Sequence, residues 1–307
     1  MERVDVVIIG AGPAGLTAGI YCGRAKVRTV VFEALSAGGQ ALMAGTIENY
    51  PGFPGGISGT ELIDRFKRQL LELGVPLEEF VKVEAVEPKD DLFLIRTSKG
   101  QAESRALIIA TGAQPARLGV PGEDRFVGQG VSFCATCDGF FFKDRRVAVV
   151  GGGDRAVEEA LFLKNMAREV FLIHRRDRLR AQRILQERLF KSPNVKPLWN
   201  HVVSEIKGDE TGVKALELLN TQSGSRTTLE VEGVFIAIGQ QPSSEIFRGL
   251  VEMDPQGFIK TDARGNTSRP GIFAAGDVRA KELRQVSTAV GDGAIAAWSA
   301  TQYLESS

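Results

Sequence analysis

The chain has 307 residues, 43% hydrophobic and 25% charged, which is typical of a soluble protein long enough for two domains. Its 38 basic side chains equal its 38 acidic ones, so no excess charge favours binding to nucleic acid or to an anionic membrane. Three cysteines are too few for a disulfide scaffold, and the first apolar run, residues 4–9, is too short and too early for a signal peptide or a membrane span. We therefore expect a cytoplasmic protein.

The N-terminal residues predict a nucleotide-binding unit. Residues 4–9 are rich in β-branched side chains and predict a buried parallel strand, which leads into the loop Gly10-Ala11-Gly12-Pro13-Ala14-Gly15. Residues 16–25 have helical composition, and residues 27–32 predict a second strand that ends at Glu33. Such glycines let the backbone approach a pyrophosphate at the helix N-terminus, and the acid accepts hydrogen bonds from a ribose. The order of elements predicts a dinucleotide site, and a tight turn without a ligand is the alternative.

Residues 36–59 lack periodicity and are expected to form a long loop, which contains Gly38-Gly39-Gln40 and Glu48-Asn49-Tyr50. A loop of this length in a compact domain is more often functional than not, although Gln40 and Asn49 could equally be turn residues. Beyond it the pattern predicts an amphipathic helix over residues 59–73, strands near 81–86 and 92–97, and a buried strand over 106–110 that ends at Thr111-Gly112.

Two thiols separated by two residues occur in Cys134-Ala135-Thr136-Cys137-Asp138, ahead of a second glycine loop. Such a pair can close a small disulfide ring, and an acid follows it directly. A zinc site would need four N or S ligands, yet the remaining candidates Cys22, His174 and His201 are not paired at ligand spacing. The sequence therefore favours a redox pair and no metal. Asp138 is a candidate acid/base, or alternatively an N-cap of the following segment. Cys22 lies among apolar neighbours and is expected to be a buried core thiol.

The order of elements then recurs. Residues 147–150 predict a strand, Gly151-Gly152-Gly153-Asp154-Arg155-Ala156 a loop, residues 157–165 a helix and residues 170–173 a strand. Glu33 stands 23 positions after Gly10, and 23 positions after Gly151 stands His174, followed by Arg175, Arg176 and Arg180. Arginines in place of the ribose acid accommodate a 2′-phosphate. A solvated basic start of a helix is the alternative.

The C-terminal residues contain no nucleotide loop of their own. They comprise a strand over 233–238 before Gly239, a strand at 271–275 that ends in Gly276-Asp277, the run Arg284-Gln285-Val286, and a small-residue helix over 287–303. We expect this tail to return to the first domain. The prediction is an α/β protein with two Rossmann-like domains, the second inserted into the first, with boundaries at residues 1–114, 115–242 and 243–307.

Taken together, these residues resemble the bacterial low-molecular-weight thioredoxin reductases, which are flavoproteins among the pyridine nucleotide-disulfide oxidoreductases. The resemblance rests on the two glycine loops, Gly38-Gly39-Gln40, residues 48–52, 134–138, 174–176 with 180–181, 275–277 and 284–285, in the order of that family. It implies FAD on the first domain, NADPH on the inserted domain, a homodimer, and thioredoxin as protein substrate. Two positions depart from the family: Arg155 replaces a small residue, often Ser or Thr, and Val286 replaces an alanine.

The resemblance also implies the site residues. Those expected to bind FAD are Gly10, Gly12, Pro13, Ala14, Gly15, Glu33, Gly39, Gln40, Asn49, Val83, Thr111, Gly112, Gly276, Asp277, Arg284, Gln285 and Val286. Those expected to bind NADPH are Gly151, Gly153, Asp154, Arg155, Ala156, His174, Arg175, Arg176, Arg180, Ile238 and Gly239.

By the same resemblance, NADPH passes a hydride to FAD, and the reduced flavin reduces the Cys134–Cys137 disulfide. Cys137 faces the flavin, Cys134 attacks the substrate disulfide, and Asp138 moves the proton. The inserted domain rotates between half-reactions about the crossings near Gln114-Pro115 and Gln240-Pro242. Two other functions fit the architecture: a flavin-dependent dithiol oxidase, which would not need the arginines, and a non-enzymatic nucleotide or redox sensor. Because Val4 opens the first strand, we expect no additional N-terminal redox domain of the kind found in related peroxide-system reductases.

Overall fold

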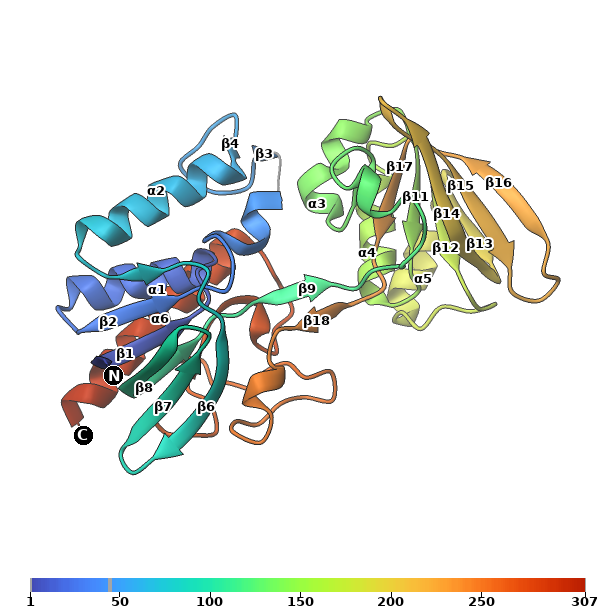
Figure 1. Ribbon diagram of the computed structural model, residues 1–307. Coiled ribbons are helices and arrows are strands. Elements are labelled where there is room, and N and C mark those ends of the chain that lie inside the picture. Colours follow the sequence, from blue (N-terminus) through green and yellow to red (C-terminus); the bar gives the residue numbers. More distant parts are fainter. Residues whose placement is uncertain (1, 44–45, 307) are drawn as a thin grey trace. The chain divides into compact units, whose positions relative to one another are not determined.

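A computed structural model describes residues 2–43 and 46–306 (Figure 1). The chain forms two compact units: unit 1 comprises Met1–Gln114 and Gln241–Ser307, and unit 2 comprises Pro115–Gln240. The chain crosses between them in two short strands, β9 (Ala113–Pro115) and β18 (Gln240–Pro242), which pair with each other. The C-terminal tail thus groups with the N-terminal residues, and the second crossing lies two residues before the boundary expected after residue 242.

Unit 1 is built on a seven-stranded sheet in the order β5-β2-β1-β8-β7-β6, with β19 also paired to β8. Strands β1, β2, β5 and β19 run parallel to their neighbours, whereas β6, β7 and β8 form an antiparallel meander. The strands are β1 (Glu2–Ile9), β2 (Thr29–Phe32), β5 (Leu77–Glu78), β6 (Val83–Lys89), β7 (Leu92–Thr97), β8 (Gly100–Ile109) and β19 (Ile272–Ala274). The helices are α1 (Pro13–Arg24), α2 (Gly59–Glu72) and α6 (Val286–Ser306), with the short turns η1 (Gly39–Met43), η4 (Glu245–Phe247) and η5 (Gly276–Val278).

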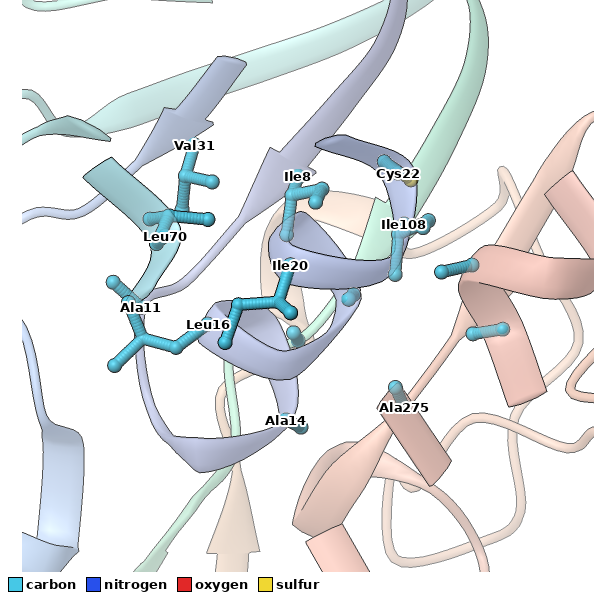
Figure 2. Close-up of a cluster of buried hydrophobic side chains, with 14 of the residues drawn as sticks. Ile8, Ala11, Ala14, Leu16, Ile20, Cys22, Val31, Leu70, Ile108 and Ala275 are labelled. Atoms are coloured by element: carbon cyan, nitrogen blue, oxygen red, sulfur yellow. The ribbon is translucent and has the colours of Figure 1, made fainter. Parts of the chain in front are cut away.

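Alternation along the central strands divides the core of unit 1 into two layers, because successive side chains point to opposite faces. Ile8 and Ile108 face helices α1, α2 and α6, while Ile9 and Ile109 face the meander and the C-terminal loops. Figure 2 shows the helical layer, in which Leu16, Ile20 and Cys22 of α1 pack among strand residues. Cys22 is fully buried, as predicted, and burial raises the pKa of its thiol to about 12.

Part of the segment expected to be irregular, residues 36–59, is ordered. It contains the turn η1 and a two-stranded antiparallel pair, β3 (Thr46–Ile47) with β4 (Ile57–Ser58). Ile47, Ile57 and Leu62 form a small apolar cluster beneath it, which explains why the segment folds back on itself. Residues 44–45 lie outside the described part of this segment.

Unit 2 repeats the parallel arrangement in a five-stranded sheet of order β10-β17-β11-β12-β13. Its strands are β10 (Val131–Ser132), β11 (Arg146–Val150), β12 (Glu169–His174), β13 (Val195–Trp199) and β17 (Gly233–Ile236). Its helices are α3 (Ala135–Asp138), α4 (Asp154–Leu163) and α5 (Arg183–Phe190), with the turns η2 (Asp124–Phe126) and η3 (Gly139–Phe142). The helices cover one face through a core that includes Val149, Ala160 and Leu172.

The opposite face of unit 2 is covered by an antiparallel sheet that sequence analysis did not predict. Its strands are β14 (His201–Asp209), β15 (Gly212–Asn220) and β16 (Arg226–Glu230). Ile206, Leu216 and Leu218 of this sheet pack against Val150 and Ile173 of the parallel sheet. Within residues 2–43 and 46–306, no helix has the length and apolar character needed to cross a membrane.

Candidate functional site

The first glycine loop connects β1 to α1 at the carboxyl end of the central strand. A Cβ at Gly15 would collide with the Gly10 carbonyl oxygen, so only glycine permits this close return of the helix onto the strand. A Cβ at Gly12 would meet nothing within 4 Å, and that of Gly39 would lie 3.5 Å from the Gly12 Cα. The Gly12 backbone therefore borders open space at a helix N-terminus, which is the geometry that receives a pyrophosphate.

Glu33 at the end of β2 closes this loop. One carboxylate oxygen accepts a hydrogen bond from the Ala11 amide at 2.7 Å, and the other accepts one from the Leu35 amide at 3.0 Å. Each oxygen keeps a second lone pair, so the carboxylate remains able to accept from ribose hydroxyls.

The C-terminal part of unit 1 brings other expected residues to the same loop. Gly276 lies against Ala14, since a Cβ built on Gly276 would be 2.9 Å from the Ala14 Cβ. Asp277 follows it, and its buried Oδ1 accepts no hydrogen bond although it lies 3.4 Å from the Lys281 ammonium nitrogen. Burial raises the pKa of Asp277, against the opposing charges of Lys281 and Arg284. A hydroxyl-bearing ligand would satisfy this orphaned oxygen, and the residues present therefore fit FAD.

The remaining residues expected to bind FAD occupy varied environments. Asn49 donates to the Gln285 side-chain oxygen at 3.0 Å, which joins the loop of residues 46–58 to the start of α6 at Val286. Arg284 stacks on Phe258 at 4.1 Å. The other five lie as follows: Pro13 begins α1, Gln40 is exposed in η1, Val83 is buried in β6, Thr111 donates to the Ser243 carbonyl at 2.6 Å, and Gly112 has φ of 70°.

The second glycine loop connects β11 to α4. A Cβ at Gly153 would meet nothing within 4 Å, as at Gly12, whereas one at Gly152 would collide with the His174 ring. His174 is buried at the position that Glu33 occupies in unit 1, and its Nε2 has no hydrogen-bond partner. Burial, reinforced by the charges of Arg180 and Arg175, lowers the pKa of His174. The imidazole is therefore neutral near pH 7, and no acid stands at this ribose position.

Four exposed arginines follow His174 in residues 175–180, and three of them, Arg175, Arg176 and Arg180, are those expected to bind NADPH. Arg180 is anchored through its backbone, whose amide donates to the Gly152 carbonyl at 2.7 Å. Asp154 fixes Gln182, two residues after Arg180, by accepting from its amide at 2.7 Å and from its side chain at 3.0 Å. Among the residues that the structure describes, no carboxylate lies within ion-pair distance of Arg175, Arg176 or Arg180. Three unneutralised guanidinium groups beside an open glycine loop fit the 2′-phosphate of NADPH.

The other residues expected to bind NADPH also belong to unit 2. Ala156 is fully buried on α4, and a Cβ built on Gly151 would lie 2.6 Å from the Ala156 Cβ. Ile238 is 41% exposed, and Gly239 has φ of 130° at the end of the segment that follows β17. The side chain of Arg155 points elsewhere: its guanidinium donates to the Phe133 carbonyl at 2.6 Å.

Cys134 and Cys137 form a disulfide with their Cα atoms 5.3 Å apart. The one-turn helix α3 begins directly after Cys134, and the amides of Cys137 and Asp138 both donate to the Cys134 carbonyl, at 3.3 and 3.1 Å. No cluster of three or more His, Cys, Asp or Glu side chains suited to a metal ion occurs within the described ranges.

Asp138 makes a contact that the sequence did not reveal. The Ser132 hydroxyl donates to the Asp138 carboxylate at 2.6 Å. The Ser132 Oγ in turn accepts a hydrogen bond from the Cys134 amide at 3.1 Å. Asp138 stands at the N-cap position of the following turn η3, as the alternative expected, but its side chain makes no capping hydrogen bond there. Burial raises the pKa of Asp138, and the Ser132 hydrogen bond lowers it. The carboxyl group is thus connected through Ser132 to the Cys134 amide and has a raised affinity for a proton. The residue spacing, Ser132 to Asp138, gave no signal of this pairing.

Comparison with known proteins agrees with these motifs. The family model described as pyridine nucleotide-disulphide oxidoreductase matches residues 4–293. A protein named thioredoxin reductase from Listeria innocua is 46% identical over 301 residues, covering 98% of this chain and 94% of the relative.

Two solved structures of thioredoxin reductases match nearly the whole chain. That from Streptococcus pyogenes is 44% identical, covers 99% of both chains and has a TM-score of 0.93. That from Lactococcus lactis, described as the FR conformation, is 42% identical and covers 99% of this chain and 100% of its own, with a TM-score of 0.70. Together with the disulfide and the two glycine loops, these matches establish that the chain belongs to the thioredoxin reductases of the pyridine nucleotide-disulphide oxidoreductase family.

Proposed function

We propose that the protein uses NADPH to reduce the disulfide of a thioredoxin, with electrons passing through FAD and through Cys134 and Cys137. The observation that carries the proposal is the Cys134–Cys137 disulfide in the same unit as a glycine loop with three unneutralised arginines. A flavin-dependent dithiol oxidase would have no use for a 2′-phosphate site, and a sensor would have no use for an acid beside the disulfide. Exposed Phe140 and Phe141, next to Asp138, supply apolar surface for a protein substrate.

When bound, the nucleotide and the flavin supply an electron pair that reaches the disulfide. The Cys134–Cys137 bond breaks, and two electrons with two protons yield two thiols. Asp138 holds one proton beside the sulfurs and gives it to the departing thiolate, a role that suits a carboxyl group whose pKa is raised by burial. Asp138 takes the proton back from Cys134, and the Cys134 thiolate then attacks the substrate disulfide. Cys137 resolves the mixed disulfide, which regenerates the Cys134–Cys137 bond and releases the substrate as a dithiol that carries away the two protons.

We also propose that unit 2 rotates between the two half-reactions. The disulfide and the second glycine loop belong to one unit, so they move together. The paired strands β9 and β18 are short, and Gly112 and Gly239 flank them with positive φ values of 70° and 130°. The Streptococcus and Lactococcus structures match this chain with similar identity and coverage but different TM-scores, so those two relatives differ in backbone arrangement. A disulfide engineered between the units should block turnover until a small thiol reduces it.

The direct test is anaerobic reduction of the purified flavin-loaded protein, followed by a thioredoxin assay with NADPH and with NADH. Wild type should lose its flavin absorbance with NADPH and then reduce thioredoxin. Cys137→Ser should still lose flavin absorbance but should not reduce thioredoxin. Turnover by Cys137→Ser would contradict the sulfur relay. Oxygen consumption coupled to dithiol oxidation, without a need for NADPH, would favour the oxidase instead.

A homodimer and a cytoplasmic location remain predictions of the family resemblance and of the low cysteine content. Light scattering of the purified protein at micromolar concentration tests the first, and fractionation of the producing cells tests the second.

A further inference from the structure

Arg155 is the residue at which this chain departs from the family in the second glycine loop. It lies in the first turn of α4, where a side chain directed at the loop could reach a pyrophosphate. Its guanidinium instead makes two contacts inside unit 2: Nε donates to Glu159 at 3.0 Å, and Nη2 donates to the Phe133 carbonyl at 2.6 Å. The side chain is 39% exposed, so these contacts form at the edge of the core.

Glu159 orients that guanidinium. It stands one helical turn after Arg155, is only 8% exposed, and uses one carboxylate oxygen for the pair while the other has no hydrogen-bond partner. A buried carboxylate is costly unless it is paired, and truncation of its partner leaves that cost uncompensated. The guanidinium is therefore held in one place by a rigid helix, with its second donor directed at the Phe133 carbonyl.

Phe133 is held from a second side as well. The Arg117 guanidinium lies over its ring at 4.9 Å from the centroid. Its carbonyl carbon is bonded to the Cys134 nitrogen, so a contact at this carbonyl fixes the peptide plane that begins the redox motif. The Cys134 amide, on the other edge of the same plane, donates to Ser132.

We propose that Arg155 is a positioning residue that ties the peptide before Cys134 to helix α4, so that the nucleotide-binding helix and the redox-active disulfide behave as one rigid piece. The proposal rests on the proposed function for its kinetic consequences, but its structural part stands apart from them. Arg155 acts on the disulfide through the Phe133 carbonyl and is not a ligand of the nucleotide.

The test compares Arg155→Ser with Arg155→Lys in the full flavin-loaded protein. Amide hydrogen exchange should show at least about fivefold loss of protection across residues 133–138 in the serine variant, because a hydrogen bond from a charged donor is lost. Lysine keeps a charged donor and should restore part of that protection. Exchange in β11 and β17 should be unchanged, which separates local release from general destabilisation.

The kinetic arm asks which half-reaction changes. Arg155→Ser should bind NADPH within about twofold of wild type, whereas turnover with thioredoxin should fall about fivefold or more at unchanged KM for NADPH. Arg145→Ser is the matched control, since the Arg145 guanidinium is also ion-paired, to Glu232 at 3.2 Å, and its hydrogen bond goes to Glu232 and not to residues 133–138. Its exchange in residues 133–138 should match wild type.

Three results would overturn the proposal. Weaker NADPH binding with normal exchange in residues 133–138 would make Arg155 a nucleotide ligand. Normal binding and normal exchange would leave its side chain without a role. Equal loss of protection in Arg145→Ser would mean that the effect is not local. If wild type itself fails to reduce thioredoxin, the proposed function fails, yet the exchange comparison still decides the structural claim.

Discussion

The two glycine loops start their helices alike but give the same helix positions to different tasks. Four and eight positions after the first glycine, α1 has Ala14 and Ala18, whereas α4 has Arg155 and Glu159. Both alanines are buried, and Ala14 packs against Gly276. Their counterparts form an ion pair that leads to the redox segment. In unit 1 this helix face packs closely against apolar neighbours. In unit 2 it carries the Arg155–Glu159 ion pair, which is hydrogen-bonded to the Phe133 carbonyl.

The last position of each loop, five residues after the first glycine, also differs between the two units. Gly15 has no room for a methyl group, but its counterpart in unit 2 is Ala156, which is fully buried and accommodated. The start of α1 in unit 1 therefore approaches the end of its strand too closely for any side chain at Gly15. The start of α4 in unit 2 leaves room for the methyl group of Ala156.

Substitution at Gly15 and at its counterpart Ala156 should give the largest effect on stability. Gly15→Ala should destabilise unit 1 by more than about 4 kcal/mol and yield protein without bound flavin, because the methyl group collides with the Gly10 carbonyl. Ala156→Gly should cost only about 2 kcal/mol, because the helix penalty of glycine adds to the loss of one buried methyl group. Flavin absorbance relative to protein absorbance, and the melting temperature, measure both. A flavin-loaded Gly15→Ala protein would show that the loop relaxes.

The residues that follow β2 in unit 1 and β12 in unit 2 offer the next test. Glu33 after β2 accepts hydrogen bonds, whereas Arg175, Arg176 and Arg180 after β12 donate them. Replacing the three arginines by glutamine should weaken NADPH by on the order of 10³-fold after screening, and should leave NADH nearly unchanged. Arg178→Gln, in the same exposed segment, is the control. Isothermal titration with both nucleotides decides, and equal losses would place the arginines outside the phosphate site.

Glu159, which replaces a buried alanine of unit 1, should make stability depend on pH. Burial raises its pKa from 4.5 to about 7, although Arg155 opposes the shift. Between these values the folded state binds more protons than the unfolded state, so this contribution to stability falls as pH rises from about 4.5 to about 7. In wild type this decrease in the free energy of unfolding should be on the order of 3 kcal/mol between these pH values, and Glu159→Gln should abolish it. Urea titrations of both proteins at pH 5 and pH 8 test it; parallel curves would contradict a shifted Glu159.

Ser132 should give the smallest effect. Its hydroxyl joins the Cys134 amide to the Asp138 carboxylate by hydrogen bonds. Unit 1 has no equivalent contact because it holds no disulfide. Ser132→Ala removes the hydrogen bond that lowers the pKa of Asp138, so burial alone remains and the pKa should rise further. The limb of the pH–rate profile that reports Asp138 should move to higher pH, with kcat changed only a few-fold. Ser132→Thr, which keeps the hydroxyl, should restore the wild-type profile.

Local order was readable from the sequence wherever neighbouring residues determine structure. The strand, loop and helix of each unit were predicted within a few residues at β1, α1, β11 and α4, because β-branched runs and glycine spacing act over short distances. The burial of Cys22 followed from its apolar neighbours. The equal spacing of 23 positions from Gly10 to Glu33 and from Gly151 to His174 also identified the corresponding residues of the two units by counting alone.

Contacts between distant segments were not readable in that way. Arg155 reaches Phe133 across 22 positions, and no pattern links an arginine in a helix to a carbonyl in a preceding loop. The strands β14, β15 and β16 were missed because their apolar residues are interrupted by exposed charges. Their apolar side chains are buried by distant strands of the parallel sheet, including Val150 and Ile173, and the local sequence does not show this packing. Both the Arg155–Phe133 contact and the antiparallel sheet depend on tertiary packing between segments that are distant in the sequence.

The paired crossings have a consequence for engineering. Since β9 and β18 lie side by side, the two ends of the inserted segment are neighbours, and the Ala116 amide donates to the Gly239 carbonyl at 3.0 Å just beyond them. A segment with adjacent ends can be exchanged as a cassette through only two junctions, or closed by a short linker and produced alone. Chimeras with relatives, joined at residues 114–115 and 240–241, would transplant a nucleotide preference and a redox motif together while leaving the host sheet uncut.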